Sequence, residues 1–101
     1  SGQVALDENG ALVGAGDLGA QTTQVMRNLG RALDAAGAGF ADVVKITTYV
    51  VGYRPEHRAV IGAARGPFFP AGQPPASTLV GIEALAAPGW LIEIEAIAVV
   101  D

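Results

Sequence analysis

The feature that most constrains the fold is the run LIEIEAIAVV at Leu91–Val100. Ten residues rich in Ile and Val, with the two charges placed two residues apart, predict a β-strand rather than a helix. Because successive side chains of a strand point to opposite faces, one face is wholly apolar and must lie on the core. The other face carries Glu93 and Glu95 between apolar ends. We expect another subunit to cover this second face and to enclose the two carboxylates.

The rest of the chain predicts two helices and four further strands. In chain order these are strand 1–6, strand 11–15, a helix between Asp17 and Gly37, strand 42–51, a helix from Pro55 to Gly66-Pro67, and strand 77–85. The complete order, β-β-α-β-α-β-β, is that of an α+β domain with a mixed sheet. Two helices cover only one face of such a sheet, so the apolar second face again indicates self-association.

Local signals define the ends of these elements. Asn9-Gly10 predicts a type I′ turn between the first two strands. Asp17 is the expected N-cap of the first helix, and Gly37 its C-terminal glycine. Gly30 costs that helix roughly 1 kcal/mol relative to Ala, which a close helix-on-sheet contact would explain. Pro55 suits the first position of the second helix, where its missing N–H does no harm. The expected buried side of that helix comprises Val60, Ile61 and Ala64.

Length and composition indicate one globular domain, residues 1–101, of which 50% are hydrophobic and 16% charged. The chain starts at Ser1 inside a predicted strand, so we expect a short native N-terminal segment to precede it. No stretch is typical of a signal peptide or a membrane span, and we therefore expect a cytoplasmic protein without a membrane partner.

Charge and residue usage exclude several classes of function. The net charge of −4 and the scattered basic residues argue against nucleic acid as a partner. The absence of cysteine excludes thiol catalysis and Cys-ligated zinc. With His57 as the single histidine, one chain cannot build a multi-histidine metal site. We expect no metal and no organic cofactor.

Glu93 and Glu95 are the first candidates for chemistry. Their Cβ atoms are expected about 7 Å apart on one side of the strand. Burial raises the pKa of a carboxylic acid toward the range useful for general acid–base catalysis, whereas two solvated carboxylates would have no such role. His57 is more typical of a surface residue than of a base. Ser77 and Thr78 offer hydroxyls, but no Ser-His-Asp arrangement surrounds them.

Taken together, these residues resemble the reactive intermediate deaminase family (RidA, or YjgF-like). The resemblance is carried by SGQVALDENGALV, Gln21-Thr22, Asn28-Leu29, Ala36-Gly37, DVVKITTYV, Phe68-Phe69, PASTLV and IEIEAIAVV, in that order along the chain. It implies a chorismate-mutase-like α+β subunit that forms homotrimers. In such trimers the open sheet faces build an inner barrel, and small molecules bind in clefts between subunits.

The resemblance also implies a reaction, the hydrolysis of enamines and imines such as 2-aminoacrylate to a 2-keto acid and ammonia. Glu93 matches the family glutamate that positions the attacking water. Ser1 and Thr78 match positions that face the ligand, and Ser77 lies between Thr78 and the position that clamps the substrate carboxylate. That clamp is an arginine in the family, whereas here Ala76 occupies its place.

Three functions follow as alternatives. The first is a cofactor-free imine or enamine hydrolase whose substrate is not 2-aminoacrylate, because a missing bidentate clamp removes about 1.5–3 kcal/mol per hydrogen bond. The second is a non-catalytic trimeric module that binds a small molecule. Ala76 favours this second function, whereas Glu93 favours the first. The third is an endoribonuclease, which the negative charge disfavours. Arg54, Arg58 and Arg65 are the cations that could replace the clamp.

Overall fold

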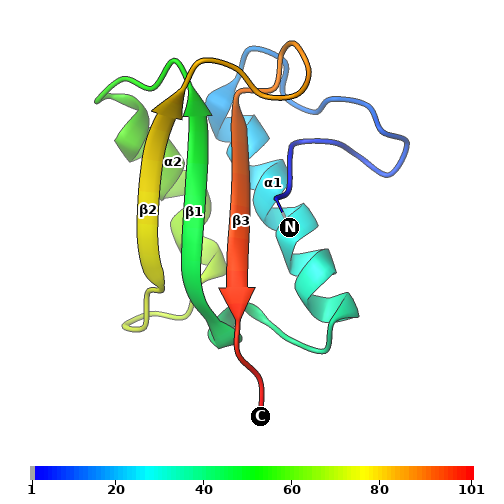
Figure 1. The fold of residues 1–101 in the computed structure, drawn as a ribbon, viewed down its shortest axis with the longest axis vertical. Helices are drawn as coiled ribbons and strands as arrows, with labels where there is room; N and C mark the ends of the chain where they lie inside the picture. The colour runs from blue at the N-terminus through cyan, green and yellow to red at the C-terminus, as the bar shows by residue number, and fades with distance from the viewer. Residues whose placement is uncertain (1) are drawn as a thin grey trace.

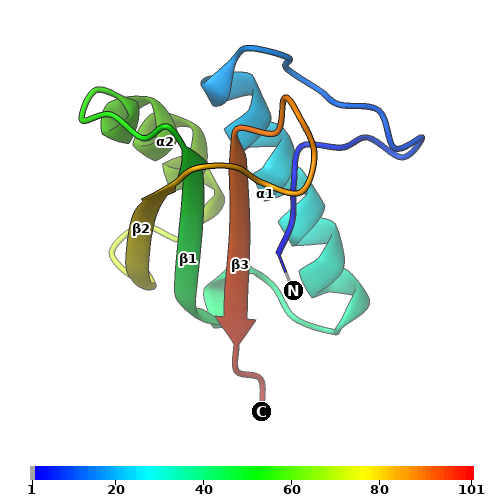
Figure 2. The same cartoon turned by 45° about the horizontal axis from the view of Figure 1, so that its top comes forward.

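The computed structural model describes residues 2–101, and Ser1, a predicted ligand-binding residue, lies outside them. The elements are α1 (Leu18–Ala35), β1 (Val43–Val51), α2 (His57–Arg65), β2 (Ala76–Ile82) and β3 (Ile92–Ala98), with short 3-10 helices at Phe40–Asp42 and Gly66–Phe68. The sheet has the order β2-β1-β3, with β1 parallel to β2 and antiparallel to β3. Figure 1 shows both helices behind this sheet, and the tilted view of Figure 2 agrees. The predicted α+β class, with two helices on one face of a mixed sheet, is confirmed.

The first two predicted strands do not form regular strands in the described chain. In the described chain they take part only in two isolated antiparallel bridges, one between Gln3 and Ile94 of β3 and one that joins the two segments, between Leu6 and Leu12. The Gln3 N–H donates to the Ile94 carbonyl at 2.8 Å, and the Ile94 N–H donates back at 3.1 Å. The N-terminal segment therefore adds to the free edge of β3 over a very short length.

The turn between these segments also differs from the predicted type I′. Gly10 has φ of 78°, but among residues 2–101 no residue other than glycine has a positive φ, so Asn9 does not adopt the required conformation. The carboxylate of Asp7 accepts the backbone N–H groups of Asn9 and Ala11, both at 2.9 Å. This side-chain hydrogen bonding by Asp7 stabilises the alternative turn.

Both predicted ends of α1 are confirmed. The Asp17 carboxylate accepts the N–H of Ala20 at 3.0 Å, and Gly37 follows the helix with φ of 78°. Gly30 is explained by a close contact, although not with the sheet. A Cβ atom at Gly30 would lie 3.0 Å from the Phe40 ring, so this glycine lets the ring pack on the helix.

The start of α2 was predicted two residues too early. The helix begins at His57 because Arg54 and His57 form a turn of their own. In this turn the His57 N–H donates to the Arg54 carbonyl at 2.9 Å, while the His57 ring Nδ1 accepts the Arg54 N–H at 3.0 Å. Pro55 lies inside the turn. The predicted buried side is right for Ile61 and wrong for Val60, which is 42% exposed.

The core fills the space between the helices and the sheet. Its members are Ala5, Val25, Met26, Leu29, Leu33, Val43, Ile46, Val50, Ile61, Ile92 and Ile94. Because all lie on one side of the sheet, the opposite face has no core of its own. Within the chain that the structure describes, no helix is long and apolar enough to cross a membrane.

Candidate functional site

The uncovered face of the sheet carries the candidate site. Strand alternation places Glu93, Glu95 and Ile97 of β3 on this face, because their neighbours Ile92 and Ile94 are buried under the helices. Ile97 is 60% exposed, and Val99 just beyond the strand is 63% exposed. The prediction of an apolar second face with carboxylates in its middle is confirmed for the isolated subunit.

Glu93 is half-buried against the N-terminal segment. A Cβ atom built on Gly2 would lie 2.7 Å from the Glu93 carboxyl carbon, so the carboxylate packs closely on Gly2 and would have to move if this residue had a side chain. The bridge between Gln3 and Ile94 fixes Gly2 at this place. Gly2 and Gln3 at one end of the chain and the last strand at the other therefore meet at the Glu93 side chain.

Glu95 has a different partner. Its Oε1 accepts the Tyr49 hydroxyl at 2.8 Å. This hydrogen bond, together with desolvation and the negative charges of Glu95 and Glu93, raises the pKa of Tyr49 above its usual 10.0. The tyrosine thus stays protonated and holds Glu95 in place. The sequence pattern makes the two carboxylates equivalent, but their contacts differ: Glu95 is bound by Tyr49, and Glu93 lies beside Gly2.

This contact gives a direct spectroscopic prediction. In Glu95→Gln the pKa of Tyr49 is expected to fall toward 10.0, because the carboxylate acceptor and its charge are both removed. Absorbance of tyrosinate during alkaline titration measures it, with Tyr49→Phe to assign the signal. Unchanged titration would contradict the hydrogen bond.

The structure separates the three residues predicted around the clamp position. Ala76 and Thr78 share the open face, whereas Ser77, paired with the buried Ile46, points to the helix side. Ala76 pairs with Lys45 of β1, and Glu93 pairs with Tyr49. Two strand spacings and four residues along the strand put Glu93 and Ala76 roughly 16 Å apart. One chain therefore does not bring Glu93 and Ala76 together.

Lys45 is a residue that the sequence analysis missed. It lies directly beside Ala76 on the open face, and its Nζ donates to the Thr78 hydroxyl. With Glu95 it lines a hollow of about 240 Å³ on this face. Alternation along β1 could have found it, since Lys45 and Tyr49 are four residues apart on the same side. Of the three arginines considered as substitutes for the clamp, none lies on this face. Arg54 pairs with Glu56, and Arg58 is exposed. Arg65, in the last turn of α2, reaches the buried Thr48 on the helix side of β1.

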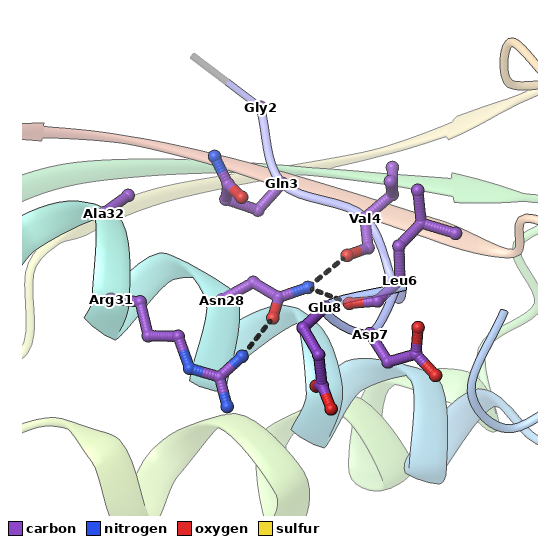
Figure 3. Close-up of a pocket in the computed structure, with 9 residues that line it drawn as sticks. All are labelled: Gly2, Gln3, Val4, Leu6, Asp7, Glu8, Asn28, Arg31 and Ala32. Carbon is purple, nitrogen blue, oxygen red and sulfur yellow. Dashed lines mark hydrogen bonds between the residues drawn. The ribbon is translucent and has the colours of Figure 1, made fainter. Parts of the chain in front are cut away.

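A second hollow, of about 440 Å³, lies between the N-terminal segment and α1 (Figure 3). Asn28 of α1 donates to the carbonyls of Val4 and Leu6, both at 2.8 Å, and its own Oδ1 accepts from Arg31 at 3.4 Å. The amide of Asn28 is occupied by these contacts, so its role is to hold the N-terminal segment. Gly2 lines the same hollow and packs on Glu93, so Asn28 holds the segment against which Glu93 lies.

Other candidate groups do not form a site. Across residues 2–101, no group of three or more His, Asp or Glu side chains is placed to hold a metal ion. The His57 ring accepts a backbone N–H and packs on Tyr53 with ring centroids 6.0 Å apart, which is a structural role.

The sequence of this chain is similar to those of known proteins. Residues 1–100 match the family model described as Endoribonuclease L-PSP. A RutC family protein of Synechocystis sp. is 34% identical over 100 residues, which cover 98% of this chain and 75% of the relative. Protein DfrA of Myxococcus xanthus is 37% identical over 99 residues, or 98% of this chain and 72% of DfrA.

Solved structures agree. A crystal structure of YyfB, a Rid-family protein of unknown function from Yersinia pestis, has a TM-score of 0.94 and 50% identity, covering 99% of this chain and 75% of YyfB. A putative endoribonuclease of Thermotoga maritima has a TM-score of 0.88 and 33% identity, covering 100% of this chain and 76% of the other. These likenesses confirm the expected type of subunit, whereas the homotrimer stays a prediction.

Proposed function

We propose that this chain, which belongs to the endoribonuclease L-PSP family that includes the Rid and YjgF-like proteins, is a cofactor-free hydrolase of imines or enamines. The observation that carries the proposal is the half-buried Glu93 carboxylate, held against Gly2 on a sheet face that its own helices leave open. A carboxylate in such a place is suited to accept a proton from water.

The proposed reaction balances with water as the only co-reactant. Glu93 takes a proton from a water molecule as its oxygen adds to the imine carbon. Glu93 returns this proton to the nitrogen, which gives a carbinolamine. The proton of the new hydroxyl group then moves to the amino nitrogen, the C–N bond breaks, and ammonia leaves as the carbonyl forms. An enamine enters the same route after tautomerising to the imine. Tyr49 keeps Glu95 hydrogen-bonded beside this centre, so Glu93 is the carboxylate left for the proton transfer.

The proposed site spans two copies of the chain. The separation of roughly 16 Å between Glu93 and Ala76 within one subunit, and the exposed apolar face that contains both, support a cleft in which Glu93 and the Ala76 edge come from different copies. We propose a homotrimer, with a small molecule as ligand. Because Ala76 brings no charge, the substrate is one that does not depend on an arginine–carboxylate pair.

The experiment uses an amino acid oxidase to generate imines from a panel of amino acids in the presence of the purified protein. Faster release of ammonia from at least one imine is expected. If no imine of the panel is hydrolysed faster, but calorimetry shows saturable binding of a metabolite, the protein is a non-catalytic binding module, the alternative that Ala76 favours. Cleavage of RNA that weakens with salt would instead support the endoribonuclease activity in the family's name.

Replacing the missing clamp tests the position of the cleft. Ala76→Arg is expected to raise the hydrolysis of 2-aminoacrylate about 10- to 100-fold, because a guanidinium there gains charge-assisted hydrogen bonds to the substrate carboxylate. Ala76 is exposed, so the larger side chain needs no rearrangement of the core. Ala84→Arg, at an exposed loop residue after β2, adds the same charge elsewhere and is expected to change nothing. Equal rates in both variants would argue against a cleft at Ala76.

A further inference from the structure

Arg65 is a half-buried cation that has no acidic partner among residues 2–101. It lies in the last turn of α2, and its Nη1 donates to the hydroxyl of Thr48, a fully buried residue of β1, at 2.9 Å. Desolvation lowers the pKa of Arg65, although an arginine remains charged in proteins. The one ion pair found in residues 2–101 joins Arg54 to Glu56 and does not involve Arg65. A single hydroxyl leaves most of the guanidinium donors available.

Two hollows meet at this arginine, and both are lined by Arg65 and Ser77. One, of about 330 Å³, extends toward the proline-rich loop 69–75. The other, of about 470 Å³, is lined also by Tyr53, Arg58 and Leu79. Arg58 lies two helical turns before Arg65 and so on the same side of α2. Among the described residues that line the two hollows, two are arginines and none is acidic, in a chain whose net charge is −4.

We propose that this Arg65 cavity binds a small organic acid, with the carboxylate on Arg65 and the apolar body against Leu79 and Tyr53. A guanidinium fork matches a carboxylate in a bidentate geometry, and the low polarity around a half-buried arginine strengthens such a pair. Arg58, exposed at the rim, attracts the anion and adds a second positive charge.

This cavity is separate from the proposed hydrolytic centre. Ser77 and Leu79 of β2 face the helices, whereas Glu93 lies on the opposite face of the sheet. An acidic side chain from a second copy is the competing occupant. The small molecule is favoured because the exposed apolar surface suited to bind another copy, which includes Ile97 and Val99, lies on the opposite face of the sheet.

The probes are benzoate and its neutral isostere benzamide, titrated into the full chain and followed by backbone amide NMR. Benzoate is expected to shift the amides of Ser77, Leu79 and Tyr53 with a dissociation constant on the order of 1 mM. Benzamide is expected to bind at least about tenfold more weakly because it cannot pair with the guanidinium. Equal binding of the two, shifts centred on Gly2 and Glu93, or no saturable shift at tens of millimolar would each overturn the proposal.

Variants assign the binding to the two arginines. Arg65→Gln is expected to weaken benzoate binding about 10- to 100-fold. Arg58→Gln is expected to weaken it by a smaller factor. Because Arg58 is exposed, this second variant still tests the proposal if Arg65→Gln folds poorly. Arg27→Gln, an exposed residue of α1, removes the same charge and is expected to leave the affinity unchanged. An Arg65→Gln protein that binds benzoate normally would overturn the proposal. A change in the mass of the assembly, measured by light scattering, would overturn it in favour of a contact between copies at Arg65. Glu93→Gln is expected to keep full benzoate binding, so this test is independent of the hydrolytic function.

Discussion

Glu93→Gln is expected to lower the rate of imine hydrolysis by about 100-fold or more, the usual size of a general-base contribution. Glutamine keeps the shape and the hydrogen-bonding reach of Glu93 beside Gly2, but it cannot take a proton from water. The affinity for substrate is expected to change little, since the neutral amide fits the same space. Ammonia release at saturating and at limiting substrate separates the two effects.

The matched control is Glu83→Gln, which makes the same change of charge at an exposed residue just after β2. It is expected to retain the wild-type rate. Glu95→Gln provides a second comparison, because it removes the carboxylate that Tyr49 holds while leaving Glu93 in place. If Glu93→Gln hydrolyses imines at the wild-type rate, Glu93 is not the base and the proposed mechanism is wrong.

Most of the fold was accessible from local signals. The alternation in β3, the cap at Asp17 and the glycine at Gly37 each depend on neighbouring residues, and the structure confirms all three. The failures have tertiary or side-chain causes. Pro55 favours a helix start, but the ring of His57 accepts a hydrogen bond from the Arg54 N–H, and the helix begins only at His57. The N-terminal segment reads as a strand, yet only one of its residues bridges β3.

The site was predictable as a set of residues and not as an arrangement. Alternation put Glu93 and Glu95 on one face, but their difference depends on Gly2 and Tyr49, which are distant in sequence. The same alternation, applied to β2, would have shown that Ser77 points away from Ala76. Arg65 could not have been placed in this way, because its burial depends on how α2 packs across β1.

The packing of the strands against α1 depends on one polar side chain inside the core. Gln21 is fully buried and satisfies three backbone groups. Its amide nitrogen donates to the carbonyls of Gly14 and Gly89, at 3.2 and 2.9 Å, and its oxygen accepts the Leu91 N–H at 2.9 Å. These contacts join the loop before α1 to the loop that delivers β3, and hence Glu93, into the sheet.

Gln21→Leu is therefore expected to lower the free energy of unfolding by about 3 kcal/mol, because the apolar side chain keeps the volume but leaves three part-buried backbone groups without their partner. For a domain of this size that corresponds to a fall in Tm of roughly 12–24 °C. Thermal unfolding followed by circular dichroism measures it. Gln21→Glu keeps the acceptor for Leu91 but turns an acceptor toward the Gly14 and Gly89 carbonyls, and it is also expected to be destabilising. Gln73→Leu, at an exposed loop residue, is expected to be neutral. A Gln21→Leu protein as stable as Gln73→Leu would mean that water replaces the lost contacts, and that β3 is held in place by its apolar face alone.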